Sequence, residues 1–147
     1  MYSHLLVPVD GTELSDRAAD ASLELARKLG AKVTAFVCES MPPLPSMGTA
    51  MAAYSRDAEA HEVRTEAHAG EVLRRFGAKA AEQGVPCDGK FIRSDSIDEA
   101  IVKAAQDYGC DLIVMVTHGR GAFGELLFGS HTKSVLTRCK LPLLVLH

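Results

Sequence analysis

One stretch constrains the fold of this chain more than any other: an apolar run at residues 112–116 followed by a glycine-rich loop. The run reads Leu-Ile-Val-Met-Val, which suits a strand covered on both faces, as in a parallel sheet. Three glycines follow within residues 119–124, and Gly129 and Ser130 come directly before a helical pattern. Glycines and the first turn of a helix both direct backbone N–H groups at an oxyanion, so this order of elements predicts an anion site.

The glycine spacing differs from two common phosphate-binding loops. Gly124 and Gly129 have the first spacing of a Walker A motif, but Ser130 and His131 follow where that motif has Lys and Ser or Thr. The glycines of residues 119–124 spell G-x-G-x-x-G. That fingerprint belongs after the first strand of its unit, with an acid about 20 residues later. Here the glycines lie late in the sequence, and residue 144 is leucine.

Strand and helix patterns alternate along the rest of the chain. Strands are expected at residues 4–10, 32–38, 87–93 and 143–146, and helices at 14–29, 54–83, 97–108 and 130–139. A capping box of Ser96 and Glu99 is expected to begin the third of these helices. The alternation predicts one α/β domain over residues 1–147, a doubly wound parallel five-stranded sheet with helices on both faces.

Residues 41–53 interrupt this alternation, because three prolines and a glycine exclude a regular element from their first half. Their methionines suggest either a soft contact surface or a mobile loop over the site, and we favour the loop. The next helix is polar all round in its first half and carries an apolar stripe from Ala69 to Ala80 in its second. The first half is therefore expected to project into solvent or against a partner.

Composition excludes several classes of function. The formal net charge of -3 predicts no electrostatic binding to nucleic acid or to an acidic membrane. No apolar run approaches the roughly 20 residues of a membrane span. The sequence starts with a strand pattern rather than a basic and apolar leader, so a cytoplasmic protein is expected. The four cysteines lack metal-ligand spacing and are expected to be small buried residues, and no metal site is expected.

The loop resembles the nucleotide loop of the universal stress protein family, whose adenine-nucleotide-binding members carry G-x2-G-x9-G-[ST]. Gly119, Gly129 and Ser130 match the second and third glycines and the hydroxyl, whereas Val116 stands at the position of the first glycine. Residues 5–13 and 111–115 also look like family signatures, so the resemblance covers essentially the whole chain.

The resemblance implies the strand order 3-2-1-4-5 of a Rossmann-like, adenine nucleotide alpha hydrolase-like fold. It implies ATP or another adenine nucleotide, with or without Mg²⁺, between strands one and four. It also implies a homodimer that acts in stress response, paired through the last strand, which consists of Leu143, Leu144, Val145 and Leu146. The expected ligand-binding residues are Pro8, Val9, Asp10, Val37, Met115, Val116, Thr117, Gly119, Arg120, Gly129, Ser130, His131 and Thr132.

Several of these residues have an ordinary structural alternative. Asp10 ends the first strand, where it can accept a hydrogen bond from adenine or ribose or can cap the following turn; we favour the ligand. Pro8, Val9 and Val37 can line an adenine pocket and belong to the core at once. Ser130 can bind phosphate and begin a helix, whereas Arg120 is as readily a solvated loop residue.

Three other functions remain as alternatives. If Val116 blocks the ribose-phosphate path, the chain would be a stress protein that acts only through dimerisation and protein partners. A slow ATPase is disfavoured because no general base and no acidic metal cluster accompany the loop. A flavodoxin-like protein is disfavoured because the chain has no Trp and few Tyr to stack on FMN. The expected role is therefore binding, without a catalytic residue.

Overall fold

A computed structural model describes residues 1–116, 135 and 137–146 of this chain. Its five strands form one parallel sheet in the order β3-β2-β1-β4-β5. The strands are β1 (His4–Pro8), β2 (Lys32–Glu39), β3 (Cys87–Arg93), β4 (Leu112–Val116) and β5 (Leu143–Leu146). The predicted class of fold and the predicted strand order are both confirmed.

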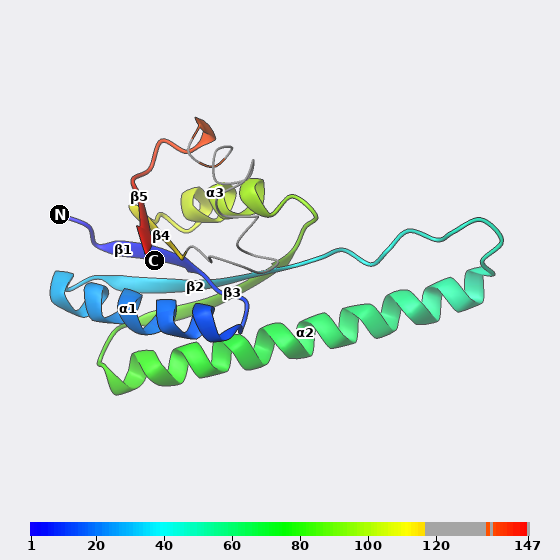
Figure 1. Cartoon of the computed structure of the whole chain (residues 1–147), viewed down its shortest axis with the longest axis horizontal. Coiled ribbons are helices and arrows are strands. Elements are labelled where there is room, and N and C mark those ends of the chain that lie inside the picture. The colour runs from blue at the N-terminus through cyan, green and yellow to red at the C-terminus, as the bar shows by residue number, and fades with distance from the viewer. Residues whose placement is uncertain (117–134, 136, 147) are drawn as a thin grey trace.

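Helices cover both faces of the sheet (Figure 1). The helices α1 (Glu13–Leu29) and α2 (Met51–Glu82) lie on one face, and α3 (Ile97–Asp107) lies on the other. Successive side chains of β1 therefore enter different cores: Leu5 and Val7 pack with α1 and α2, whereas Leu6 packs with α3. Val135 belongs to the α3 side, so the helical residues after the glycine loop help to cover that face.

The ends of α1 follow from local chemistry. The hydroxyl of Thr12 accepts a hydrogen bond from the backbone N–H of Ser15, which satisfies one free donor of the first helical turn. Gly30 ends the helix with φ 65°, a left-handed conformation that glycine adopts without a steric penalty. The predicted helix stop at Gly30 is confirmed.

The predicted capping box of α3 is wrong. The side chain of Ser96 makes no capping hydrogen bond, although Ser96 occupies the N-cap position. The Ser94 hydroxyl accepts from the backbone N–H of Ser96 at 3.1 Å, which is the donor that Glu99 would satisfy in a capping box. Glu99 instead pairs with Arg138.

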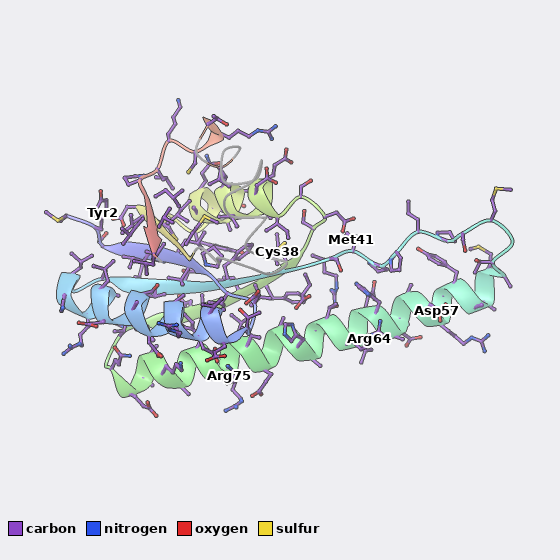
Figure 2. All side chains as sticks on the ribbon, viewed as in Figure 1. Tyr2, Cys38, Met41, Asp57, Arg64 and Arg75 are labelled. Carbon is purple, nitrogen blue, oxygen red and sulfur yellow. The ribbon has the colours of Figure 1, made fainter. Side chains whose placement is uncertain are left out.

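The long helix α2 divides into two halves. Its buried residues all lie in the C-terminal half, where Ala69, Val72, Phe76 and Ala80 confirm the predicted apolar stripe. This half is also tied to α1 by two ion pairs, Arg75 with Asp16 and Lys79 with Asp20; Figure 2 labels Arg75.

The N-terminal half of α2, residues 51–68, contains no buried residue. The helix begins at Met51, three residues before the start that the pattern predicted. Residues 40–46 precede it as an extended segment that runs away from the sheet (Figure 1), so the preferred interpretation of a loop over the site is wrong. The prolines of this segment exclude it from a helix, and it makes no turn that would bring it back over the strands.

Asp111 joins the start of β4 to the start of β1. Its carboxylate accepts hydrogen bonds from the backbone N–H and hydroxyl of Ser3, both at 2.8 Å, and from the backbone N–H of His4 at 2.9 Å. Burial alone would raise the pKa of this carboxyl, but the hydrogen bonds from His4 and Ser3 outweigh burial and lower the pKa below its ordinary value.

We expect Asp111→Ala to lower the free energy of unfolding at neutral pH by about 1–2 kcal/mol, because three donors lose a charged acceptor. The folded-state pKa of Asp111 is lowered, so its contribution is present above the unfolded-state pKa and disappears as the pH falls through the folded-state value. The stability difference between parent and variant should therefore shrink below about pH 4. Denaturant unfolding at a series of pH values measures this, and a pH-independent difference would contradict it.

Candidate functional site

The carboxyl ends of β1 and β4 lie side by side, at the edge of the sheet that is formed by the carboxyl ends of the strands. The two strands pair in parallel, with Leu5 opposite Leu112 and Leu6 opposite Ile113. β1 then ends at Pro8 and β4 at Val116. β2 and β3 lie on one side of this pair and β5 on the other, so the strand order reverses here. Ligands of open parallel sheets bind at such a switch point, which makes this edge the candidate site.

Asp10 lies directly beyond β1 in a turn made of interlocking hydrogen bonds. Its Oδ1 accepts from the backbone N–H of Thr12 at 3.0 Å and from the Thr12 hydroxyl at 2.8 Å. Its own backbone N–H donates to the hydroxyl of Ser15 at 3.0 Å. These bonds fix the orientation of the carboxylate, so the alternative of a turn-capping role is realised in the structure.

The capping role uses only one oxygen of the Asp10 carboxylate. Among the described residues, no hydrogen bond or ion pair to Asp10 Oδ2 is found. Asp10 is half-buried, so this oxygen is an oriented acceptor at the switch point rather than a fully solvated charge. A carboxylate in this position can accept hydrogen bonds from an amino group or a hydroxyl group of a ligand.

The apolar candidates at this edge belong largely to the core. Val9 and Val37 are buried in the cluster beneath α1 and α2, with 6% and 1% of their surface exposed. Met115 is buried in the opposite cluster beneath α3. Among the described apolar candidates, Pro8 is half-buried and keeps a partly open side chain. Of the described residues, a ligand there would therefore meet mainly backbone and the side chains of Pro8 and Asp10, with Val9 and Val37 buried behind them.

The other half of the predicted site lies outside the described residues. Val116 is placed by its backbone alone, as the last residue of β4. The remaining predicted ligand-binding residues are outside the described part of the chain: Thr117, Gly119, Arg120, Gly129, Ser130, His131 and Thr132.

A pair of residues that the sequence did not single out borders the same edge. Glu39 ends β2, and its Oε1 lies 2.5 Å from Nδ1 of His68 on α2. A Cβ atom on Gly11 would lie 3.3 Å from His68 Nε2 and 2.7 Å from Val72 Cγ2. α2 is therefore closely packed against the turn that carries Asp10. No sequence motif predicts the contact between Glu39 and His68, because residues 40–50 separate the two elements that carry these side chains.

The thiols and the other titratable groups give no sign of reaction chemistry in the described part of the chain. Burial raises the pKa of Cys38 and of Cys110 to about 11, so both are neutral thiols at neutral pH. Among the described residues, no group of three or more His, Cys, Asp or Glu side chains is placed to hold a metal ion. None of the described helices is both long enough and apolar enough to cross a membrane.

Comparison with known proteins gives a consistent result. The model of the family described as "Universal stress protein family" matches residues 1–147. A universal stress protein of Thermus aquaticus is 31% identical over 99% of this chain and 98% of its own length. The universal stress protein YxiE of Bacillus subtilis is 27% identical over 99% of both chains. A solved family member from Burkholderia pseudomallei has a TM-score of 0.74 at 25% identity, covering 99% of this chain and 96% of its own.

Three solved structures with the same fold contain an adenine nucleotide. A universal stress protein in complex with cAMP has a TM-score of 0.70 at 21% identity, over 99% of this chain and 97% of its own. One from Archaeoglobus fulgidus contains dAMP (0.64, 19%, 99% and 98%). One from Arabidopsis thaliana contains AMP (0.67, 15%, 98% and 90%). At these identities the likeness itself shows the fold.

The packing of α2 on the Asp10 turn gives a prediction. Gly11→Ala should lower the free energy of unfolding by about 3 kcal/mol, because φ is 82° and the new methyl meets the buried Val72. Gly30→Ala is the matched control: φ is 65° but nothing lies within 4 Å, so about 1 kcal/mol is expected. Denaturant unfolding of both variants measures the difference. Equal losses of unfolding free energy in the two variants would show that α2 is not closely packed against the turn.

Proposed function

Because this chain belongs to the universal stress protein family, we propose that it binds an adenine nucleotide at the switch point between β1 and β4. The observation that carries the proposal is the carboxylate of Asp10. Its Oδ1 is fixed by Thr12, and its Oδ2 has no hydrogen-bond partner among the described residues. Asp10 follows directly after β1, the strand that pairs with β4. Solved proteins of this fold that hold cAMP, dAMP or AMP support the class of ligand.

The chemistry of the edge suits the nucleoside half of such a ligand. A carboxylate only accepts hydrogen bonds, so Asp10 selects donors, which adenosine offers as its amino group and its ribose hydroxyls. Exposed backbone groups just beyond the strand ends can add bonds to the edge of the base. The buried Val9 and Val37 hold these backbone groups rigidly, which lowers the entropic cost of binding.

We propose that the phosphates bind to the loop that follows β4. Gly119, Gly129 and Ser130 match the family motif at this point, with Arg120, His131 and Thr132 beside them. Two or more phosphates would extend along this loop, so ATP is the proposed ligand. Mg²⁺ would be held mainly by the phosphates and water, as it usually is in nucleotide sites.

The proposed role is occupancy-dependent signalling in stress response rather than turnover, in the cytoplasm. Free, half-buried thiols at Cys38, Cys87 and Cys139 suit a reducing compartment. The second candidate rests on Val116, which replaces the first glycine of the motif. If its side chain closes the ribose-phosphate path, the protein acts through dimerisation and protein partners instead.

We propose a homodimer formed through the edge strand β5. Among the described strands, β5 pairs with β4 alone and forms one edge of the sheet, a position where a strand of a second copy can add. Leu143, Leu144 and Leu146 pack against the two cores, whereas the half-buried Val145 belongs to neither hydrophobic cluster of the described residues. Val145 is therefore the apolar side chain of β5 that a partner would cover.

The first test is calorimetric titration of nucleotide-stripped protein with Mg-ATP and with AMP. Asp10→Asn keeps an acceptor for Thr12 but replaces the free oxygen by an amide donor, so affinity should fall about 10–100-fold. Ser130→Ala should weaken ATP more than AMP if it contacts the distal phosphates. Asp20→Asn on α1 is the matched control for loss of one negative charge and should leave affinity unchanged.

Two results would decide against nucleotide binding. No heat of binding and no thermal shift at millimolar Mg-ATP would reject the site in the parent chain. If Val116→Gly then gains binding, the second candidate is supported, because only the side chain at the first motif position has changed. Equal binding by the parent and Val116→Gly would show that Val116 does not obstruct the path.

The dimer gives a separate prediction. Light scattering should give a molar mass of at least twice the 15.7 kDa of one chain. Val145→Lys should halve that mass, because a two-fold contact would bring two like charges together, while the circular dichroism of the fold is retained. An unchanged mass would reject β5 as the interface.

A further inference from the structure

Residues 40–68 form an arm whose outer part stands off the domain. It consists of the extended segment after β2, a turn at Met47 and Gly48, and the N-terminal half of α2. No residue of the arm belongs to either hydrophobic cluster of the described chain. Figure 2 labels Asp57 and Arg64 on the part of α2 that lies beyond the body. The proposed nucleotide site uses none of these residues.

The root of the arm is firmly attached. The imidazole of His61 lies 3.0 Å from the carbonyl oxygen of Ser40, which ties the helix to the extended segment. Arg93 of β3 donates to the carbonyl oxygen of Glu62 at 2.8 Å. The backbone N–H of Met41 donates to Asp95 at 3.0 Å. The arm therefore leaves the domain in a defined direction rather than as a free coil.

The outer part of the arm, residues 42–55, is called the arm tip below. Its loop is stabilised by hydrogen bonds within the tip itself, between Ser46 and Thr49. Its large apolar side chains are open to solvent: Leu44 is 88% exposed, Met47 104% and Met51 73%. The sequence between Glu39 and Arg56 contains no charged side chain, although 24% of the whole chain is charged. Such an apolar and uncharged tip is typical of a contact surface.

The lack of charge favours a second copy of this chain as the partner. In a two-fold contact each residue near the axis faces its own equivalent, so any charge there meets a like charge. A different protein could match charges on the tip with opposite ones, whereas an identical tip has no such option. Methionines suit this contact because their flexible side chains can repack against themselves across the axis.

We propose that the arm tip is a self-association surface, which pairs with the arm tip of a second copy around a two-fold axis. The contact is separate from β5, because β5 forms the far edge of the sheet from β3, to which the root of the arm is tied. With both contacts present, each chain carries two different two-fold contacts, and the assembly is larger than a dimer. With the arm contact alone, the protein is a dimer.

The first test introduces charge at the tip. Leu44→Asp with Met47→Asp should lower the molar mass found by light scattering, to that of a dimer where β5 also pairs and to that of one chain where it does not. The control, Ala81→Asp, adds a charge at an exposed position near the other end of α2 and should leave the mass unchanged. The comparison does not depend on β5. In a Val145→Lys background, where the arm contact alone would give a dimer, the arm variant should halve the molar mass.

The second test traps the contact covalently. Met47→Cys should give a disulfide-linked dimer quickly on mild oxidation, whereas Ala81→Cys reports random collision and should link slowly. Burial raises the pKa of Cys38, Cys87 and Cys110. Both cysteine variants are made in a Cys139→Ser background, because Cys139 is a free, half-buried thiol. A parent mass that the tip charges leave unchanged, or equal rates of linking for the two cysteine variants, would overturn the proposal.

Discussion

The position of β1 between β2 and β4 is the constraint on which the rest of the structure depends. The strand is hydrogen-bonded on both sides and covered on both faces, and Leu5, Leu6 and Val7 are almost completely buried. A strand in this position must be short, apolar and continuous. Because both neighbours are parallel to it, their carboxyl ends meet at one edge, and the switch in strand order falls beside Asp10. The position of the candidate site is thus a consequence of the order of the strands in the sheet.

Asp10 shows how one residue can have a structural role and a ligand-binding role at the same time. Its Oδ1 organises the turn into α1, and its Oδ2 has no hydrogen-bond partner in the described part of the chain. A side chain that is already held by its own turn loses little entropy when it binds a ligand. The capping role and the ligand role were alternatives in the sequence, but the geometry makes them compatible.

The helix α2 carries two functions along one continuous backbone. Its C-terminal half buries Ala69, Val72 and Phe76 against the sheet, which fixes the direction of the whole helix. Its 32 residues span about 48 Å, so the N-terminal half must extend beyond the domain. Ala, Glu and Arg dominate that half and favour helix without tertiary contacts. A helix that is anchored at one end can therefore present an apolar tip at a distance from the core.

The sequence by itself determined the class of fold, most element boundaries to within a few residues, and the apolar stripe of α2. These features depend on local periodicity and glycine stops, which act within one element. The family resemblance supplied the strand order, which no local pattern contains. Only the tertiary structure decided that Glu99 pairs with Arg138, that Glu39 and His68 meet, and that the arm extends away from the site. Each of these depends on where distant elements lie in space, and the free energy of such contacts has no signature in the spacing of residues along the chain.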